Sequence, residues 1–361
     1  MSYVHEPEPS VRLPMAVEEI DAAWLTAALR TVAPEAEVLK AEVADVMRGT
    51  CTKVWIDVEA QGLQLPSRIM LKSGFEPHSR EWWYMHETEV RGYLHILPEL
   101  ALPSPACYFA AYSDAQKQGV ILMEDLVSSG ATFCHAQRPA TQDETRRRLA
   151  TLAAFHARSW RSSRFAPGGD WSWIQDVARD TRDYAQAFLK PDVWNHYVAL
   201  PRGAAVARRF HDAAWLGEAL EKLVTLSDRL PHCVVHGDTH SGNLYVAADG
   251  TPGFFDSLPG HAPPISEVAY HLVCALDTED RRNWEADLVR FYLSELGSHG
   301  IDPPTFEQAM DQYAAFLARA YFIFIINASE FQKEAVNTAY TARISAAMLD
   351  HDTAGRIAAI R

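Results

Sequence analysis

Three side chains that could carry phosphoryl chemistry lie within one short stretch of the chain. Asp238 follows a short apolar run, Asn243 comes five positions later, and Asp256 ends a second apolar run. Transfer of a phosphoryl group requires such a set, because one oxygen positions and deprotonates the attacking hydroxyl while two hold the magnesium ion that neutralises the phosphates. The stretch therefore indicates phosphoryl transfer.

The same stretch allows two other interpretations. His236, Asp238 and His240 alternate as ligands do in the metal sites of some hydrolases. A metal-dependent hydrolase built on this His-Gly-Asp-Thr-His cluster would bind zinc or manganese without nucleotide. The spacing of Asp238 and Asn243 alone also occurs in plain structural loops, so the rest of the sequence is needed to choose.

Three upstream segments supply that context. Residues 67–72 form an apolar run that ends in Lys72, as in a strand that presents an ammonium group at its end. The next segment has helical periodicity and carries two acidic candidates, Glu87 and Glu89. Residues 119–126 are typical of a buried strand that runs into Glu-Asp-Leu.

Taken in order, these pieces resemble the aminoglycoside phosphotransferase and ecdysteroid-kinase-like (CHK kinase-like) families of small-molecule kinases. The resemblance rests on a strand-end Lys, a helical Glu, the strand before Glu-Asp-Leu, His-Gly-Asp-x-x-x-x-Asn and a late Asp, and it spans residues 40–275. The sequence departs from the protein kinase pattern at two points. The loop begins His-Gly-Asp instead of His-Arg-Asp, and Asp256 precedes Ser257-Leu258 instead of Phe-Gly.

The resemblance implies an α+β, bilobal protein-kinase-like fold. It predicts a small mixed β-sheet amino lobe over residues 1–124 that binds nucleotide, and a larger, mostly helical carboxy lobe over residues 125–361 that carries the catalytic loop and the acceptor site. ATP is expected in the cleft between the lobes. Ahead of the first strands, residues 17–32 are predicted to form an amphipathic helix.

Roles for single residues also follow from the resemblance. Asp238 is the expected catalytic base, and Asn243 and Asp256 are the expected ligands of Mg²⁺. Lys72 is expected to contact the α- and β-phosphates of ATP and to be oriented by Glu89. Glu87 is the second choice for that partner.

The remaining nucleotide contacts are expected from backbone groups. The segment after the strand at 119–123 corresponds to the hinge that hydrogen-bonds adenine, here Met123, Glu124 and Leu126. A phosphate-covering loop is expected at Gly49 and Thr50, where small residues let backbone N–H groups approach phosphate oxygens. This loop lacks the Gly-x-Gly-x-x-Gly pattern, so a simple hairpin turn is the alternative.

Two segments of the predicted helical lobe remain. Glu267 occupies a position at which the families usually have an Asp that braces the catalytic loop, and the replacement leaves that brace open. The segment at residues 162–201 is rich in aromatic side chains, including Trp173 and Trp194, and is either an acceptor pocket or ordinary core. His156, on an apolar helical face, is expected to be a core residue.

Composition limits the partners. A net charge of −14 argues against nucleic acid and anionic membrane surfaces, because both require clustered Lys and Arg. Five widely spaced cysteines without a Cys-x-x-Cys motif fit a reducing cytoplasm. Residues 1–14 are polar and the apolar stretch at 314–328 is interrupted by Arg319, so no signal peptide or membrane span is expected.

The sequence therefore predicts a cytoplasmic kinase that uses ATP and Mg²⁺ to phosphorylate a hydroxyl of a small molecule. Aminoglycoside-like and bulky sterol-like alcohols are the leading acceptors, and choline-like amino alcohols are also compatible with the families. Besides the metal-dependent hydrolase, a catalytically silent ATP-binding scaffold remains open. It would bind nucleotide without releasing ADP.

Overall fold

The computed structural model describes residues 8–329 and 331–361. Residues 1–7, the first part of the predicted polar amino-terminal segment, lie outside the described residues. The chain divides into two compact units. Unit 1 contains the described residues up to Thr132 together with Tyr245–Leu258, and unit 2 contains Phe133–Leu244 and Pro259–Arg361.

Unit 1 is built on a five-stranded antiparallel sheet with the strand order β1-β2-β3-β5-β4. Its strands are β1 (Glu37–Met47), β2 (Thr52–Gln61), β3 (Arg68–Ser73), β4 (Cys107–Ser113) and β5 (Gln118–Glu124). The helical elements of this unit are η1 (Val17–Glu19), α1 (Ala22–Arg30), η2 (Pro77–Arg80), α2 (Trp83–Arg91), the π-helical turn η3 (Gly92–Ile96) and α3 (Leu97–Leu100).

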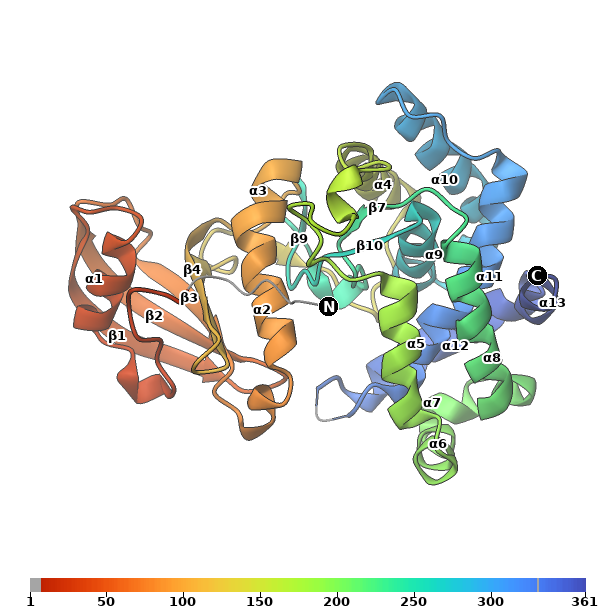
Figure 1. Cartoon of the computed structure of the whole chain (residues 1–361), viewed down its shortest axis with the longest axis horizontal. Helices are drawn as coiled ribbons and strands as arrows, with labels where there is room; N and C mark the ends of the chain where they lie inside the picture. The colour runs from red at the N-terminus through yellow and green to blue at the C-terminus, as the bar shows by residue number, and fades with distance from the viewer. Residues whose placement is uncertain (1–7, 330) are drawn as a thin grey trace. The chain divides into compact units, whose positions relative to one another are not determined.

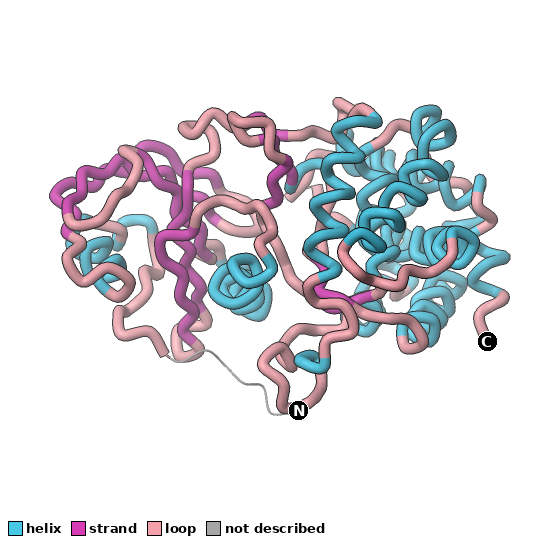
Figure 2. Tube along the Cα trace, turned by 90° about the horizontal axis from the view of Figure 1, so that it is seen from above, coloured by secondary structure: helices cyan, strands magenta, loops and turns pink. Residues whose placement is uncertain are grey.

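The two faces of this sheet have different partners. In Figures 1 and 2, α1 and α2 lie on opposite sides of the strands. Side chains alternate between faces along a strand, so Ile69 and Leu71 of β3 join the apolar cluster that contains α1. Lys72, the next residue, therefore projects from the opposite face, on the side of α2.

The predicted helix at residues 17–32 is shorter than expected. A 3₁₀ turn covers Val17–Glu19, and the α-helix begins only at Ala22. The reason is Asp21, whose side chain accepts a hydrogen bond from the Trp24 amide and caps the helix at that point. The prediction began the helix too early because it used apolar periodicity and did not consider the capping residue.

Unit 2 is mostly helical, as the cyan tube of Figure 2 shows. Its longer helices are α4 (Gln142–Ala157), α5 (Val177–Phe188), α6 (Pro191–Val198), α8 (Ala213–Ser227), α9 (Pro264–Ala275), α10 (Thr278–Ser298), α11 (Phe306–Ile326) and α12 (Glu334–Asp350). The shorter helical elements are η4 (Ser163–Phe165), α7 (Pro201–Ala204), η5 (Arg208–Phe210), η6 (Ser241–Asn243) and α13 (Thr353–Ala358).

Five short strands remain among the described residues. In unit 2, β7 (Cys233–Val235) pairs antiparallel with β10 (Gly260–Ala262). The divisions between the units fall inside β6 (Thr132–Phe133) and β8 (Leu244–Val246), and β9 (Pro252–Phe254) belongs to unit 1. The predicted division at 124/125 lies eight residues before the one at 132/133, and the separate segment Tyr245–Leu258 was not part of that prediction.

The core of unit 2 surrounds α9 and α11. Every residue of α9 is buried, and α11 contributes fourteen buried residues. By length and composition α11 could cross a membrane, but 78% of its apolar window is buried inside the protein, as in the core helix of a globular unit. The small antiparallel sheet of unit 1 and the helical unit 2 confirm the predicted α+β class.

Candidate functional site

In unit 1 the structure brings together three of the sequence-predicted residues. The Nζ atom of Lys72 lies 2.6 Å from Oε1 of Glu89 and 3.0 Å from Oδ1 of Asp256. Lys72 and Glu89 are buried, at 7% and 4% exposure. Burial opposes the charge of Lys72, but the Asp256 and Glu89 carboxylates outweigh it and raise the lysine pKa well above its usual range. Lys72 is therefore a fixed buried cation.

The other acidic candidate of α2 has a different partner. Glu87 lies 3.7 Å from Arg91, one helical turn further along α2. Because Glu87 and Glu89 are two positions apart, they occupy different faces of the helix. The expected preference for Glu89 over Glu87 agrees with this geometry, while its role toward a nucleotide stays a prediction.

A second lysine, Lys53, reaches the same carboxylate. Its Nζ lies 3.0 Å from Oδ2 of Asp256, and its cross-strand partner in β3 is Lys72. The two ammonium groups hold the pKa of Asp256 below its usual range although burial opposes the charge. Lys53 was missed at the sequence level, although the alternation of polar and apolar residues in β2 places it on the face that carries Lys72.

Asp256 itself has an unusual backbone. Its φ is +55°, in the left-handed region that non-glycine residues rarely adopt. It follows Phe255 after the end of β9, so the strained turn aims the carboxylate toward the two lysines. Strain of this kind persists where surrounding contacts over-determine the conformation, which is typical of functional sites.

The predicted phosphate-covering loop is the turn between β1 and β2. Glu76 anchors its ends, since it accepts hydrogen bonds from Arg48 and Thr52 at 2.8 and 3.0 Å. Gly49 has no positive φ, and an added Cβ would meet only the Cys51 carbonyl at 3.7 Å. The backbone of the turn therefore does not require glycine at this position, and the glycine leaves the loop without a side chain there. Thr50 is fixed through its carbonyl, 3.1 Å from the His78 ring.

The predicted hinge begins within β5, whose last two residues are Met123 and Glu124. Met123 is buried, and its sulfur lies 3.8 Å from the Tyr93 hydroxyl. The Glu124 amide donates to the Ala106 carbonyl at 2.8 Å. Leu126 accepts from the Ala131 amide, while its own N–H has no backbone acceptor among the residues that the structure describes. The role of this segment toward adenine stays a prediction.

In unit 2, Asp238 lies in the loop after β7 with both carboxylate oxygens occupied. Oδ1 accepts a 2.6 Å hydrogen bond from the Tyr270 hydroxyl, and Oδ2 accepts one of 2.9 Å from the Asn243 amide. His240 Nε2 lies 3.4 Å from Oδ2. Burial opposes the charge, but His240 and the hydroxyl of Tyr270 lower the Asp238 pKa to about 2. The side chain remains 32% exposed, so a ligand can reach it.

Tyr270 and the orientation of Asn243 are findings of the structure. Tyr270 comes from α9, and its own pKa is raised well above the usual range by burial and by Asp238, so it stays a hydrogen-bond donor. Asn243 donates through Nδ2 to both the side chain and the carbonyl of Asp238. This arrangement leaves the Asn243 Oδ1 atom for another ligand.

Glu267 anchors the loop that carries Asp238. Its carboxylate accepts the amides of His236 at 3.0 Å and Gly237 at 2.9 Å, and it lies 2.9 Å from the His156 ring. Gly237 has a φ of +91°, a conformation that explains glycine at this position. Burial would raise the pKa of Glu267, but the hydrogen bond from His156 and the nearby imidazoles hold it below the usual range. Glu267, although longer than the Asp usual in the families, thus holds the loop, a point that the sequence did not decide.

His156 is a core residue in this geometry. It is fully buried, and its other ring nitrogen lies 2.8 Å from the Tyr292 hydroxyl. On the far side of the loop, Arg319 of α11 donates to the Gly237 carbonyl at 3.2 Å. The loop is therefore fixed from α9 and from α11.

The histidines around Asp238 do not form the metal cluster of a hydrolase. His236 Nδ1 accepts the Asp238 amide at 3.3 Å, and His240 Nδ1 accepts the Gly242 amide at 2.9 Å. Within residues 8–329 and 331–361, the grouping of three metal-ligating side chains lies elsewhere and includes none of these residues. His240 thus serves as the cap of the turn η6.

The tryptophans of the aromatic segment are core residues. Trp171, Trp173 and Trp194 are 2%, 8% and 2% exposed. Trp194 also donates through its ring nitrogen to the His211 carbonyl. Of the two alternatives for this segment, core packing is the one that fits Trp173 and Trp194, because both rings are buried. Tyr184, at 40% exposure, is an aromatic side chain of this segment that solvent reaches.

Comparisons with known proteins identify the fold. Among solved structures, the GDP complex of wild-type aminoglycoside 2'-phosphotransferase-IIIa is similar with a TM-score of 0.51 and 10% identity, covering 89% of this chain and 98% of that one. Amicoumacin kinase hAmiN, in complex with AMP-PNP, Ca²⁺ and Ami, gives a TM-score of 0.50 and 10% identity, covering 84% and 87%. No curated protein matches the sequence significantly. These likenesses show a shared kinase fold.

The sequence itself supplies the family. Residues 76–307, more than half of the chain, match the phosphotransferase enzyme family. The matched range includes Glu89 of unit 1, the loop around Asp238 and the turn at Asp256. The chain belongs to the phosphotransferase enzyme family.

Proposed function

We propose that the protein transfers the γ-phosphoryl group of ATP to a hydroxyl group of a small molecule. Unit 1 supplies the nucleotide contacts through Lys72, Lys53 and the hinge. Unit 2 supplies the acceptor-activating Asp238. The assignment of ATP as donor is supported by the family match and by the AMP-PNP complex of the similar amicoumacin kinase.

The observation that carries this proposal is the buried ammonium of Lys72 between two carboxylates. A buried lysine with two acidic partners is costly to maintain for stability alone, because desolvation offsets much of the Coulombic gain. Its position at the end of β3, beside the strained turn at Asp256, suits a cation that passes from a carboxylate to a phosphate oxygen when nucleotide binds. Lys53 can make the same exchange from Oδ2.

The two residues that the family resemblance assigns to Mg²⁺ each offer a hard oxygen. Asn243 has its amide oxygen available because Nδ2 is committed to Asp238, and Asp256 offers a carboxylate that the two lysines keep ionised. Oxygen ligands of this kind fit Mg²⁺, which keeps several of its waters and shares phosphate oxygens. When bound, Mg²⁺ would neutralise charge that develops on the phosphates.

Asp238 handles the acceptor in this proposal. With a pKa of about 2 it is ionised at neutral pH and accepts a hydrogen bond from the acceptor hydroxyl. So weak a base takes the proton late, as bond formation to phosphorus advances, which is compatible with a loose transition state. Tyr270 and Asn243 fix the carboxylate for this contact, so positioning contributes much of the rate.

The acceptor class is the finer part of the proposal. We favour an aminoglycoside-like alcohol over a bulky sterol-like one, because the net charge of −14 suits a cationic substrate. The similar aminoglycoside phosphotransferase and amicoumacin kinase give this choice further support. The buried tryptophans of unit 2 weaken the case for a large aromatic-lined sterol pocket. A cytoplasmic location stays a prediction from the sequence.

A panel assay tests the proposal. The protein is incubated with Mg-ATP and with aminoglycosides, sterols and amino alcohols, and ADP release is followed with each acceptor and with none. Acceptor-dependent release that disappears in Asp238→Asn supports the kinase. A nucleotide-dependent rise in melting temperature without ADP release for any acceptor would instead indicate the silent scaffold, and stoichiometric zinc at His236 and His240 without nucleotide binding would indicate the hydrolase.

A further inference from the structure

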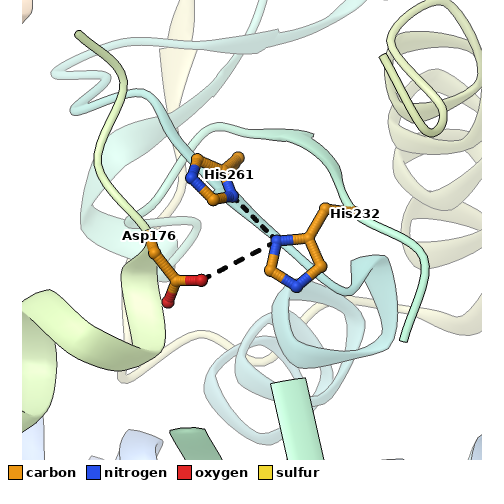
Figure 3. A group of neighbouring side chains, drawn as sticks. All are labelled: Asp176, His232 and His261. Atoms are coloured by element: carbon orange, nitrogen blue, oxygen red, sulfur yellow. Dashed lines mark hydrogen bonds and ion pairs between the residues drawn. The ribbon is translucent and has the colours of Figure 1, made fainter. Parts of the chain in front are cut away.

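A cluster of metal-ligating side chains lies in unit 2, outside the loop of Asp238. Asp176, His232 and His261 each offer one ligand atom, and these atoms lie within 4.8 Å of one another (Figure 3). In the described part of the chain this is the one such grouping of three residues. None of the three has a part in the proposed phosphoryl transfer.

Three backbone elements hold the cluster in place. His232 immediately precedes β7, and His261 is the middle residue of β10, the strand paired with β7. Asp176 precedes α5 and forms an isolated bridge with His261. The His232 carbonyl also accepts the Arg161 amide at 2.7 Å. The three side chains therefore converge because strand pairing and a helix start fix their backbones.

The hydrogen bonds fix which ring nitrogens carry protons. His232 Nε2 lies 2.9 Å from the Ser227 carbonyl, so this nitrogen carries the proton and Nδ1 keeps its lone pair. In the 2.8 Å contact between the two Nδ1 atoms His261 is therefore the donor, and its proton has to move to Nε2 when Nδ1 binds an ion. A ring N–H donated to a backbone carbonyl is the usual way in which proteins orient a metal-binding histidine. Asp176 uses Oδ1 to accept the Ala178 and Arg179 amides, which leaves Oδ2 facing His232 at 3.9 Å.

The spacing is near that of a tetrahedral ion. His232 Nδ1 and His261 Nδ1 lie 2.8 Å apart, joined by a hydrogen bond. Two nitrogens bound to one zinc ion at about 2.0–2.1 Å would be separated by about 3.3 Å. The imidazoles would have to part by about half an ångström, and Asp176 Oδ2 would have to approach by a similar amount. Rotations about side-chain bonds can supply both shifts.

The electrostatics favour a cation of this kind. Arg179, in the first turn of α5, donates to both oxygens of Asp228 at 2.6 and 2.7 Å, so its charge is paired outside the cluster. The His261 ring also stacks on Phe165, with ring centroids 5.0 Å apart. The cluster thus offers a carboxylate and two imidazoles beside an aromatic ring.

We propose that Asp176, His232 and His261 bind a divalent transition-metal ion of the zinc class, with water as the fourth ligand. Two imidazole nitrogens and one carboxylate suit zinc, whereas Mg²⁺ prefers oxygen ligands alone. The bound ion links the start of α5 to β7 and β10. Because β7 runs directly into the loop of Asp238, the ion stabilises the strand that carries the catalytic loop.

Matched asparagine variants test the site by titration. The untagged full chain, dialysed against a chelator, is titrated with Zn²⁺ and with Co²⁺. Asp176→Asn keeps a side-chain oxygen for the α5 cap but loses the charged ligand, and Asp212→Asn makes the same change at the cap of α8, outside the cluster. We expect wild type and Asp212→Asn to bind one zinc ion, and Asp176→Asn to bind it about tenfold or more weakly.

Two further measurements make the test independent of a single variant. His261→Gln should also weaken zinc binding, while Asp238→Asn should leave it unchanged and so exclude the catalytic loop as the source. The X-ray absorption spectrum of zinc-loaded wild type should show two imidazole ligands. Equal zinc affinity in wild type and Asp176→Asn, an all-oxygen shell, or no binding at micromolar Zn²⁺ would overturn the proposal.

Discussion

Replacing Glu267 with Gln should show whether Glu267 supports the catalytic loop specifically or only contributes to the stability of the helical core. The carboxylate accepts hydrogen bonds from the amides of His236 and Gly237 and from the His156 ring, and it is 4% exposed. Gln has nearly the same shape, but it has no charge and turns one acceptor oxygen into a donor. The substitution therefore tests the hydrogen bonds without opening a cavity.

The cost follows from those contacts. Each of the three bonds should lose about 1 kcal/mol with the charge, and a buried amide facing the new NH₂ group should cost about 1–3 kcal/mol more. We expect the free energy of unfolding to fall by about 4–6 kcal/mol in total. Because Asp238 follows Gly237 directly, a displacement of about 1 Å should lower kcat by about 100-fold.

Urea unfolding and steady-state ADP release measure the two effects, and a second buried glutamate provides the control. Glu285 in α10 pairs with Arg281 and His351 and lies outside the catalytic loop. Glu285→Gln should also destabilise unit 2 but should leave kcat unchanged. If Glu267→Gln keeps both stability and kcat, or if both glutamine variants lower kcat equally, the brace is not a specific support of the loop.

Three further outcomes follow from the geometry. Asp238→Asn should lower kcat by about 10²–10⁴-fold and leave the ATP dissociation constant, measured by calorimetry, unchanged; more than a tenth of wild-type turnover would rule out a base. Lys53→Met should raise the KM for ATP but change the unfolding free energy by less than about 1 kcal/mol, since Lys53 is partly exposed; an unchanged KM would show that Lys53 does not contact phosphate. Burial lowers the pKa of His271 to about 4, so below about pH 6.5 the unfolded chain binds a proton that the folded chain does not bind. The free energy of unfolding should therefore fall by about 2 kcal/mol from pH 7 to pH 5 through this group. In urea titrations His271→Asn should lack this part of the decrease, and an identical pH dependence in wild type and variant would contradict the prediction.

Several candidate site residues could be predicted from the order in which short motifs follow one another along the chain. Lys72 and Glu89 each lie in a recognisable segment, and the structure places their charged atoms 2.6 Å apart. The α+β class was implied by the resemblance that these ordered segments carry. Such residues can be predicted because the hydrophobic pattern identifies the strand or helix and the motif gives the residue's position in it.

Contacts made by distant segments were not visible in that way. Tyr270 reaches Asp238 only because α9 packs beside the catalytic loop, and periodicity marks Tyr270 simply as a buried helical residue. The choice between pocket and core stayed open for Trp194 because composition does not reveal which aromatic side chains are buried. The cluster of Asp176, His232 and His261 likewise depends on the pairing of β7 with β10, and no local motif in the sequence predicts that pairing.

Mass spectrometry of a small-molecule acceptor after incubation with Mg-ATP would show whether the chain moves a phosphoryl group from ATP to a hydroxyl. We expect at least one hydroxylated compound, most of all an aminoglycoside, to gain one phosphoryl group with wild type and none with Lys72→Met or Asp238→Asn. ATP binding with no phosphorylated product from any acceptor, or a product formed equally by Asp238→Asn, would refute the proposed transfer.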